Sequence, residues 1–84
     1  VDEVVRAAEL LDRAIATAAQ YAKGAVVAQG IAKRAVLGGL DGTLAAGLEL
    51  EHAGFVEVFG TEDARIGVAS FLEHGPGKAT FSGR

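Results

Sequence analysis

Glu51 and His52 are residue types that could carry acid–base chemistry, because a carboxylate and an imidazole can both transfer protons near neutral pH. Neighbours on a helix, however, point ~100° apart and do not face each other. Glu51 also interrupts an otherwise apolar helical stripe. We therefore interpret Glu51 as a buried or interfacial residue that accepts hydrogen bonds, and we expect no catalytic residue in this segment.

Other kinds of site have little support in the sequence. The two histidines lie 22 positions apart and there is no cysteine, so no metal-ligand cluster is predicted. Gly38-Gly39 lacks the lysine and serine of a phosphate-binding loop, and we interpret the pair as a helix stop. Lys33 and Arg34 are adjacent, so only one of them can face a given phosphate, and a solvated face is the expected role.

The charge pattern argues against nucleic acid and membranes as partners. The net charge is −3, and the eight basic residues are scattered along the chain. No apolar run approaches the ~20 residues of a membrane span. Without cysteine, no disulfide indicates an oxidising compartment, and nothing suggests secretion. We expect a cytoplasmic protein, or a mitochondrial one if the source is eukaryotic.

The predicted core is thin. Half of the 84 residues are hydrophobic, but 17 of these are alanine, which contributes helix propensity more than hydrophobic free energy. Twelve glycines and the absence of a disulfide or metal add to the difficulty of folding alone. We therefore expect this chain to associate, either with a missing domain or with sister subunits.

Helical periodicity positions all of these residues, and no strand-like alternation is present. Asp2 is the expected N-cap of the first helix, whose stripe from Val5 to Ala22 should be buried. The pattern predicts an all-α protein with a flexible tail, disordered unless docked, over 74–84. The predicted helices span residues 3–23, 25–37, 44–59 and 62–73.

The start of the last helix carries the strongest signal. Thr61 can cap the free N–H groups, and Glu62 and Asp63 place negative charge at the positive end of the helix dipole. The string from Phe59 to Glu73 resembles the C-terminal segment of the enoyl-CoA hydratase/isomerase (crotonase) family, although Ile66 replaces the usual Glu. Three further blocks keep the family's order and spacing, so that the resemblance covers roughly residues 25 to 84: Ile31–Val36, Gly39–Asp41, and Gly47–Glu51 followed by Phe55.

This resemblance implies that the chain is the C-terminal helical domain of such an enzyme, with the catalytic spiral core absent. The domain would cover the acyl-CoA site and pack subunits into trimers or hexamers. The parent protein would hydrate or isomerise enoyl-CoA thioesters in fatty-acid metabolism, with a coenzyme A thioester as substrate and no tightly bound cofactor. The segment alone is expected to be inactive, and its pattern does not choose among the family's reactions.

The resemblance also suggests which residues bind substrate. Aromatic residues at the positions of Phe55 and Phe71 line the acyl or pantetheine end of the pocket, whereas helical spacing alone would make both plain core residues. His74 stands where relatives have a lysine that reaches a coenzyme A phosphate. A neutral imidazole is the poorer phosphate partner, so Lys78 is the substitute. For both His74 and Lys78, the sequence favours simple exposure on a flexible tail over this phosphate contact.

Two other interpretations stay open. A stand-alone helical interaction or oligomerisation module with no enzymatic activity would also lack catalytic groups. A degenerate family member kept as a structural subunit is the third possibility. The start at Val1 without an initiator Met hints at truncation, and it favours the interpretation of the chain as the C-terminal domain of an enzyme.

Overall fold

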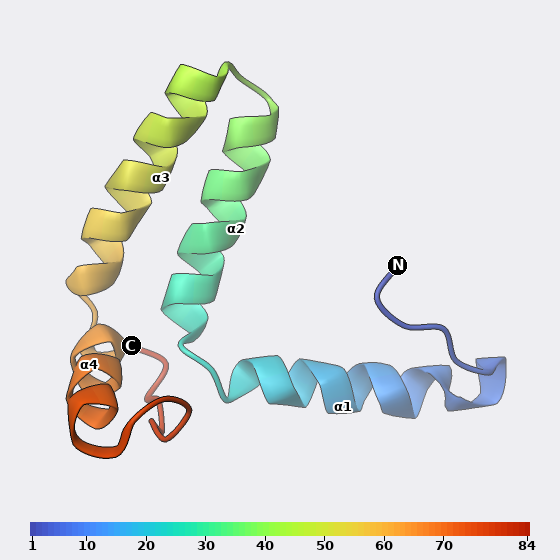
Figure 1. Cartoon of the computed structure of the whole chain (residues 1–84). Coiled ribbons are helices and arrows are strands. Elements are labelled where there is room, and N and C mark those ends of the chain that lie inside the picture. The colour runs from blue at the N-terminus through green and yellow to red at the C-terminus, as the bar shows by residue number, and fades with distance from the viewer.

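The computed structural model describes all residues, 1–84, and contains helices without any strand (Figure 1). The predicted all-α class is therefore confirmed. A short 3₁₀ turn precedes four α-helices, and in chain order these elements are η1 (Ala7–Glu9), α1 (Leu10–Ala22), α2 (Val26–Leu40), α3 (Leu44–Phe59) and α4 (Glu62–His74).

The helices form an open arrangement rather than a bundle. Figure 1 shows α2 and α3 side by side as an antiparallel hairpin, with α1 leaving its base sideways and α4 lying beyond the end of α3. The radius of gyration is 15.9 Å, whereas a compact domain of this length has about 12 Å. Most of the helical surface is therefore free to contact something outside the chain.

The burial pattern supports the same conclusion. Only Ile31, Gly54 and Asp63 are buried, and Ile31 is the one buried hydrophobic side chain. The accessible surface is 6787 Å², about 2,100 Å² more than a compact monomer of this mass would expose. The predicted burial of the α1 stripe is wrong, since Leu11 and Ile15 are 70% and 59% exposed.

Close backbone contact holds the α2–α3 hairpin. A Cβ on Gly54 would lie 2.8 Å from Cγ2 of Ile31, and one on Gly47 would lie 3.3 Å from Cα of Gly39. The prediction that Gly38-Gly39 stops the second helix at residue 37 is wrong, because α2 continues to Leu40. Neither glycine has a positive φ. The pair is explained by packing, since it leaves room for α3 next to the last turn of α2.

The predicted first helix, 3–23, is too long at its start. Residues 1–6 have no regular structure, and Asp2 caps nothing, because the helical part begins only at Ala7. Most helical stability in proteins comes from packing of an apolar face, and this end packs against no other helix. Glu3 instead accepts two hydrogen bonds from Nε of Arg13 at 2.7 and 2.9 Å.

The remaining boundaries agree with the sequence analysis or move by one residue. The third helix has the predicted range, 44–59, and begins at Thr43, whose Oγ1 accepts a hydrogen bond from the Ala46 N–H. Thr61 caps α4 in the same way, through the Ala64 N–H at 3.1 Å. The last helix ends at His74 instead of residue 73. The tail that follows is docked, because it returns to the start of α4.

Candidate functional site

A groove of about 500 Å³ runs along the α2–α3 hairpin. Apolar and small side chains line most of it, and Glu51 is its single charged residue. Glu51 is exposed and makes no side-chain hydrogen bond, so it is not buried within this chain, and its place at an interface stays a prediction. An apolar channel with one carboxylate fits a hydrophobic ligand or a hydrophobic protein surface.

Phe55 lines this groove from α3 and is 64% exposed. Its ring centroid lies 5.0 Å from that of Phe59, and the two rings are tilted by 55°. Such aromatic pairs contribute attraction beyond their apolar contact. The pairing holds the Phe55 ring at the wall of the groove, but it leaves most of that ring uncovered.

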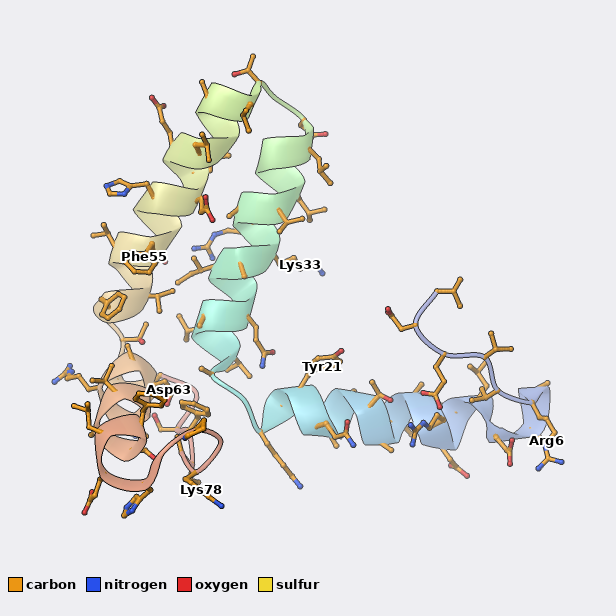
Figure 2. The ribbon with its side chains drawn as sticks, viewed as in Figure 1. Arg6, Tyr21, Lys33, Phe55, Asp63 and Lys78 are labelled. Atoms are coloured by element: carbon orange, nitrogen blue, oxygen red, sulfur yellow. The ribbon has the colours of Figure 1, made fainter.

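A second pocket, of about 440 Å³, lies where the C-terminal tail passes the end of α1. Phe71 and Lys78 both line it, together with Lys23 and Gly24. The structure therefore brings two of the predicted site residues together. It does not join Phe55 to them: Figure 2 shows Phe55 on α3 and Lys78 on the tail below α4, far apart.

His74 lies outside both pockets. Its Nε2 lies 3.5 Å from Oε2 of Glu73, and both side chains are more than half exposed. A carboxylate at that distance competes with any phosphate for the imidazole. Of the two predicted phosphate partners, Lys78 alone lines a pocket.

Asp63 anchors the end of the C-terminal tail, although the sequence analysis assigned it only to the helix dipole. Its Oδ1 accepts hydrogen bonds from the Ser82 N–H at 2.6 Å and the Ser82 hydroxyl at 2.9 Å, and its Oδ2 accepts one from the Gly83 N–H at 2.9 Å. The Asp63 N–H donates to the Arg84 carbonyl at 2.8 Å. No local sequence signal reveals this anchor, because its partners lie about twenty positions away.

The ionisation of Asp63 is balanced between two opposing effects. Burial of the carboxyl group disfavours the charged form and by itself would raise its pKa. The hydrogen bonds from the Ser82 backbone and hydroxyl, with those from the following backbone, stabilise the carboxylate and leave the pKa lowered overall. The tail is therefore held by an ionised carboxylate at neutral pH.

The remaining charged candidates form no site. Arg34 reaches across the hairpin to Glu57, with Nη2 3.0 Å from Oε2, which explains it as a surface ion pair. Lys33 has no carboxylate partner. No group of three or more His, Cys, Asp or Glu residues is placed to hold a metal ion. None of the four α-helices is both long and apolar enough to cross a membrane.

The chain is similar in sequence to part of a longer curated protein. A curated protein named probable enoyl-CoA hydratase, from Rhizobium meliloti (strain 1021), is 39% identical to this chain over 72 residues. The match covers 86% of this chain but only 28% of the relative. No protein-family model matches the chain, and no solved structure matches it.

Proposed function

We propose, from the premise that this chain is related to the enoyl-CoA hydratase/isomerase family and matches it as a C-terminal segment would, that it covers the acyl-CoA site of such an enzyme and helps to assemble its subunits. The observation that carries this proposal is the open α2–α3 groove. It is apolar and unpartnered, and it belongs to a chain that spans 28% of its relative. The whole of residues 1–84 would act as one helical domain.

The groove suits the acyl end of a thioester. Phe55 at its wall would exclude water from the acyl chain, and exclusion of water strengthens the hydrogen bonds that stabilise charge developing on a thioester oxygen. Phe71 and Lys78 line the other pocket. They would contact a different part of the same coenzyme A molecule, or the substrate bound to a neighbouring subunit. The groups that perform hydration or isomerisation would lie outside this segment.

The exposed surface supports the assembly role. A standard protein interface buries about 800 Å² on each partner, and this chain exposes about 2,100 Å² beyond the surface of a compact monomer. The excess is large enough for an obligate interface. We propose a trimer or hexamer of the complete protein.

A chimera tests both roles. In it, this chain replaces the matching part of the Rhizobium meliloti relative, and hydration of enoyl-CoA thioesters and the mass in solution are measured. Removal of the segment should abolish assembly, and the chimera should restore it. If the protein without the segment retains full activity and the same number of subunits, the proposal is wrong.

Phe55→Ala in the chimera sharpens the assignment of the groove. We expect a KM increase on the order of tenfold, the effect of about 1.4 kcal/mol of lost apolar contact. Val56→Ala is the matched control, because Val56 is on the same helix and is similarly exposed, at 61%, but does not line the groove. Equal KM values for the two variants would contradict the role of Phe55.

A stand-alone interaction module is the second candidate. The observation in its favour is that neither the α2–α3 groove nor the second pocket contains a nucleophile–base or metal-ligand arrangement. It predicts that the isolated 84-residue chain forms a defined oligomer and that acyl-CoA thioesters do not change it. Sedimentation with and without butyryl-CoA separates the two candidates.

A further inference from the structure

Two apolar hollows of the chain carry single charges of opposite sign. The α2–α3 groove has Glu51 as its one charged residue. A hollow of about 450 Å³ lies where α3 ends and α4 begins, and its one charged residue is Arg65. The other residues that line this hollow are apolar: Phe59, Ala64, Val68, Ala69 and Leu72. Each hollow therefore offers an apolar surface with one charge.

Neither charge has a partner within the chain. Glu51 and Arg65 are both exposed, and neither takes part in any of the chain's ion pairs. Arg34, by contrast, is already paired with Glu57 across the hairpin. An unpaired charge on an apolar surface is attracted most strongly by an opposite charge that arrives with its own apolar surface, because such a contact excludes the water that screens the attraction.

The two hollows belong to one continuous face. Glu51, Phe55 and Phe59 lie four positions apart along α3, so their side chains share one side of that helix. Phe55 lines the groove and Phe59 lines the hollow at α4, and their ring centroids are 5.0 Å apart. Figure 2 shows Phe55 near the end of α3 from which the chain continues into α4. We call this surface the α3–α4 face and define it by Glu51, Phe55, Phe59, Arg65 and Leu72.

The α3–α4 face is uncovered and large enough for a stable contact. Phe55 and Phe59 are 64% and 57% exposed, and Leu72 is 79% exposed. The chain exposes about 2,100 Å² more than a compact monomer of its mass would. A standard protein interface buries about 800 Å² on each partner. One such contact would therefore cover less than half of the excess surface.

The order of the charges makes this face complementary to itself. A carboxylate lies at one end and a guanidinium at the other, with two aromatic rings between them. When a second copy is placed against the face after a rotation of 180°, Arg65 of each copy meets Glu51 of the other. The same surface is used on both copies, so the contact is closed and contains two ion pairs. A parallel placement would set like charges against each other and is therefore unfavourable.

We propose that the α3–α4 face binds a second copy of this chain about a two-fold axis, with Arg65 of each copy paired to Glu51 of the other. A guanidinium suits this place, because it can bind a carboxylate through two parallel hydrogen bonds and is more weakly hydrated than an ammonium group. The inference goes beyond the proposed function, since it specifies the surface and the symmetry of one contact and needs no acyl-CoA. A hexamer built from two trimers would contain two-fold contacts of this kind.

Sedimentation of the 84-residue chain over a range of concentrations tests the contact, and we expect a monomer–dimer equilibrium. Glu51→Arg and Arg65→Glu should each weaken dimerisation by at least about tenfold, because each sets like charges against each other at both ion pairs. An equal mixture of the two variants should restore the dimer, since both pairs in a mixed dimer again join opposite charges. Misfolded variants could not restore it.

Glu49→Arg is the matched control. Glu49 is exposed on α3, lines neither hollow and lies two positions from Glu51, so it points to another side of the helix. This variant changes the net charge as Glu51→Arg does and should leave the dimer unchanged. A chain that stays monomeric, an equal loss in Glu49→Arg, or a mixture that associates no better than the separate variants would overturn the proposal. An assembly of three copies would also overturn it, because the contact is two-fold.

Butyryl-CoA separates this inference from the proposed function, because Phe55 belongs to both. A dimer that depends on Arg65 and Glu51 and is shifted by butyryl-CoA supports both. The same dimer without a response to butyryl-CoA supports the inference and favours the interaction module over the proposed function. If butyryl-CoA binds to a chain that stays monomeric, the inference is wrong and the proposed function survives.

Discussion

The α2–α3 hairpin and the unit formed by α4 with its tail are held together by different physical means. In the hairpin, glycines let two helices approach until backbone and Ile31 are in contact. In the other unit, the buried carboxylate of Asp63 holds the C-terminal tail by accepting hydrogen bonds from it. Contact between apolar surfaces does not depend on ionisation, whereas the tail depends on the charge of Asp63. The comparison shows that a chain with almost no core can still fix local geometry in two independent places.

The largest expected effect breaks the hairpin. Gly54→Ala would place a methyl group 2.8 Å from Cγ2 of Ile31, a buried β-branched side chain with little freedom to move. We expect a loss of about 1–3 kcal/mol in the free energy of unfolding. Urea denaturation followed by circular dichroism measures it.

Gly30→Ala is the matched control for this substitution. Gly30 lies in α2, and a Cβ there would meet no atom within 4 Å. The variant should therefore be neutral or more stable by up to about 1 kcal/mol, from helix propensity alone. Equal denaturation midpoints for the two variants would show that close approach does not hold the hairpin.

The next prediction is that only the unit formed by α4 and its tail depends on pH. Because the pKa of Asp63 is lowered in the folded chain, its stabilising contribution is present in full above the ordinary value of about 3.9. That contribution is lost as the pH falls below this value through the lowered pKa. The amide signals of Ser82 and Gly83 should shift over this acid range, whereas Gly47 in the hairpin should report no tail transition. A transition that persists in Asp63→Asn would assign it to another group.

Substitution of the two N-cap threonines compares the units more finely. Thr61 Oγ1 accepts a hydrogen bond from the Ala64 N–H and donates one of 2.7 Å to the Val58 carbonyl. Thr43 Oγ1 makes only the bond from the Ala46 N–H, at 3.2 Å. Each Ala substitution should cost about 1 kcal/mol of helix stability, with the larger loss at Thr61. Thermal unfolding measures both, and a larger loss at Thr43 would reverse the ranking.

The smallest effect concerns the ion pair across the hairpin. The side chains of Arg34 and Glu57 are 65% and 56% exposed, so solvent screens their attraction. A double-mutant cycle with Arg34→Gln and Glu57→Gln should give a coupling of about 0.2–1 kcal/mol. The coupling should shrink as salt is added. A larger, salt-insensitive coupling would mean that this pair, and not the glycine contact, holds the hairpin.

Local signals explain which parts of the fold could be predicted. Thr43 and Thr61 mark helix starts by their own side chains, and the turn after His74 follows from Gly75, Pro76 and Gly77. The pair Gly38-Gly39 was misread because glycine serves both to end a helix and to let another backbone approach, and the sequence does not distinguish the two uses. The start of the first helix was misread because a cap without packing does not hold a helix.

The residues of the candidate site could also be predicted only in part. The sequence, through its resemblance to a family, selected Phe55, Phe71, His74 and Lys78. The structure shows that Phe71 and Lys78 share a pocket, that Phe55 belongs to a different one, and that His74 lies in neither. The role of Asp63 as the anchor of the tail was missed, because its partners Ser82 and Gly83 lie far away along the chain.

The sequence by itself determined that this protein is all-α, where most of its helices begin and end, and that it is similar over 72 residues to part of a probable enoyl-CoA hydratase. These properties depend on neighbouring residues or on the order of residues along the chain. Only the tertiary structure decided that α2 and α3 meet at glycines, that the apolar stripes are exposed, and that Asp63 binds the end of the tail at Ser82 and Gly83. Those features depend on contacts between distant residues, and periodicity carries no information about which distant residues meet.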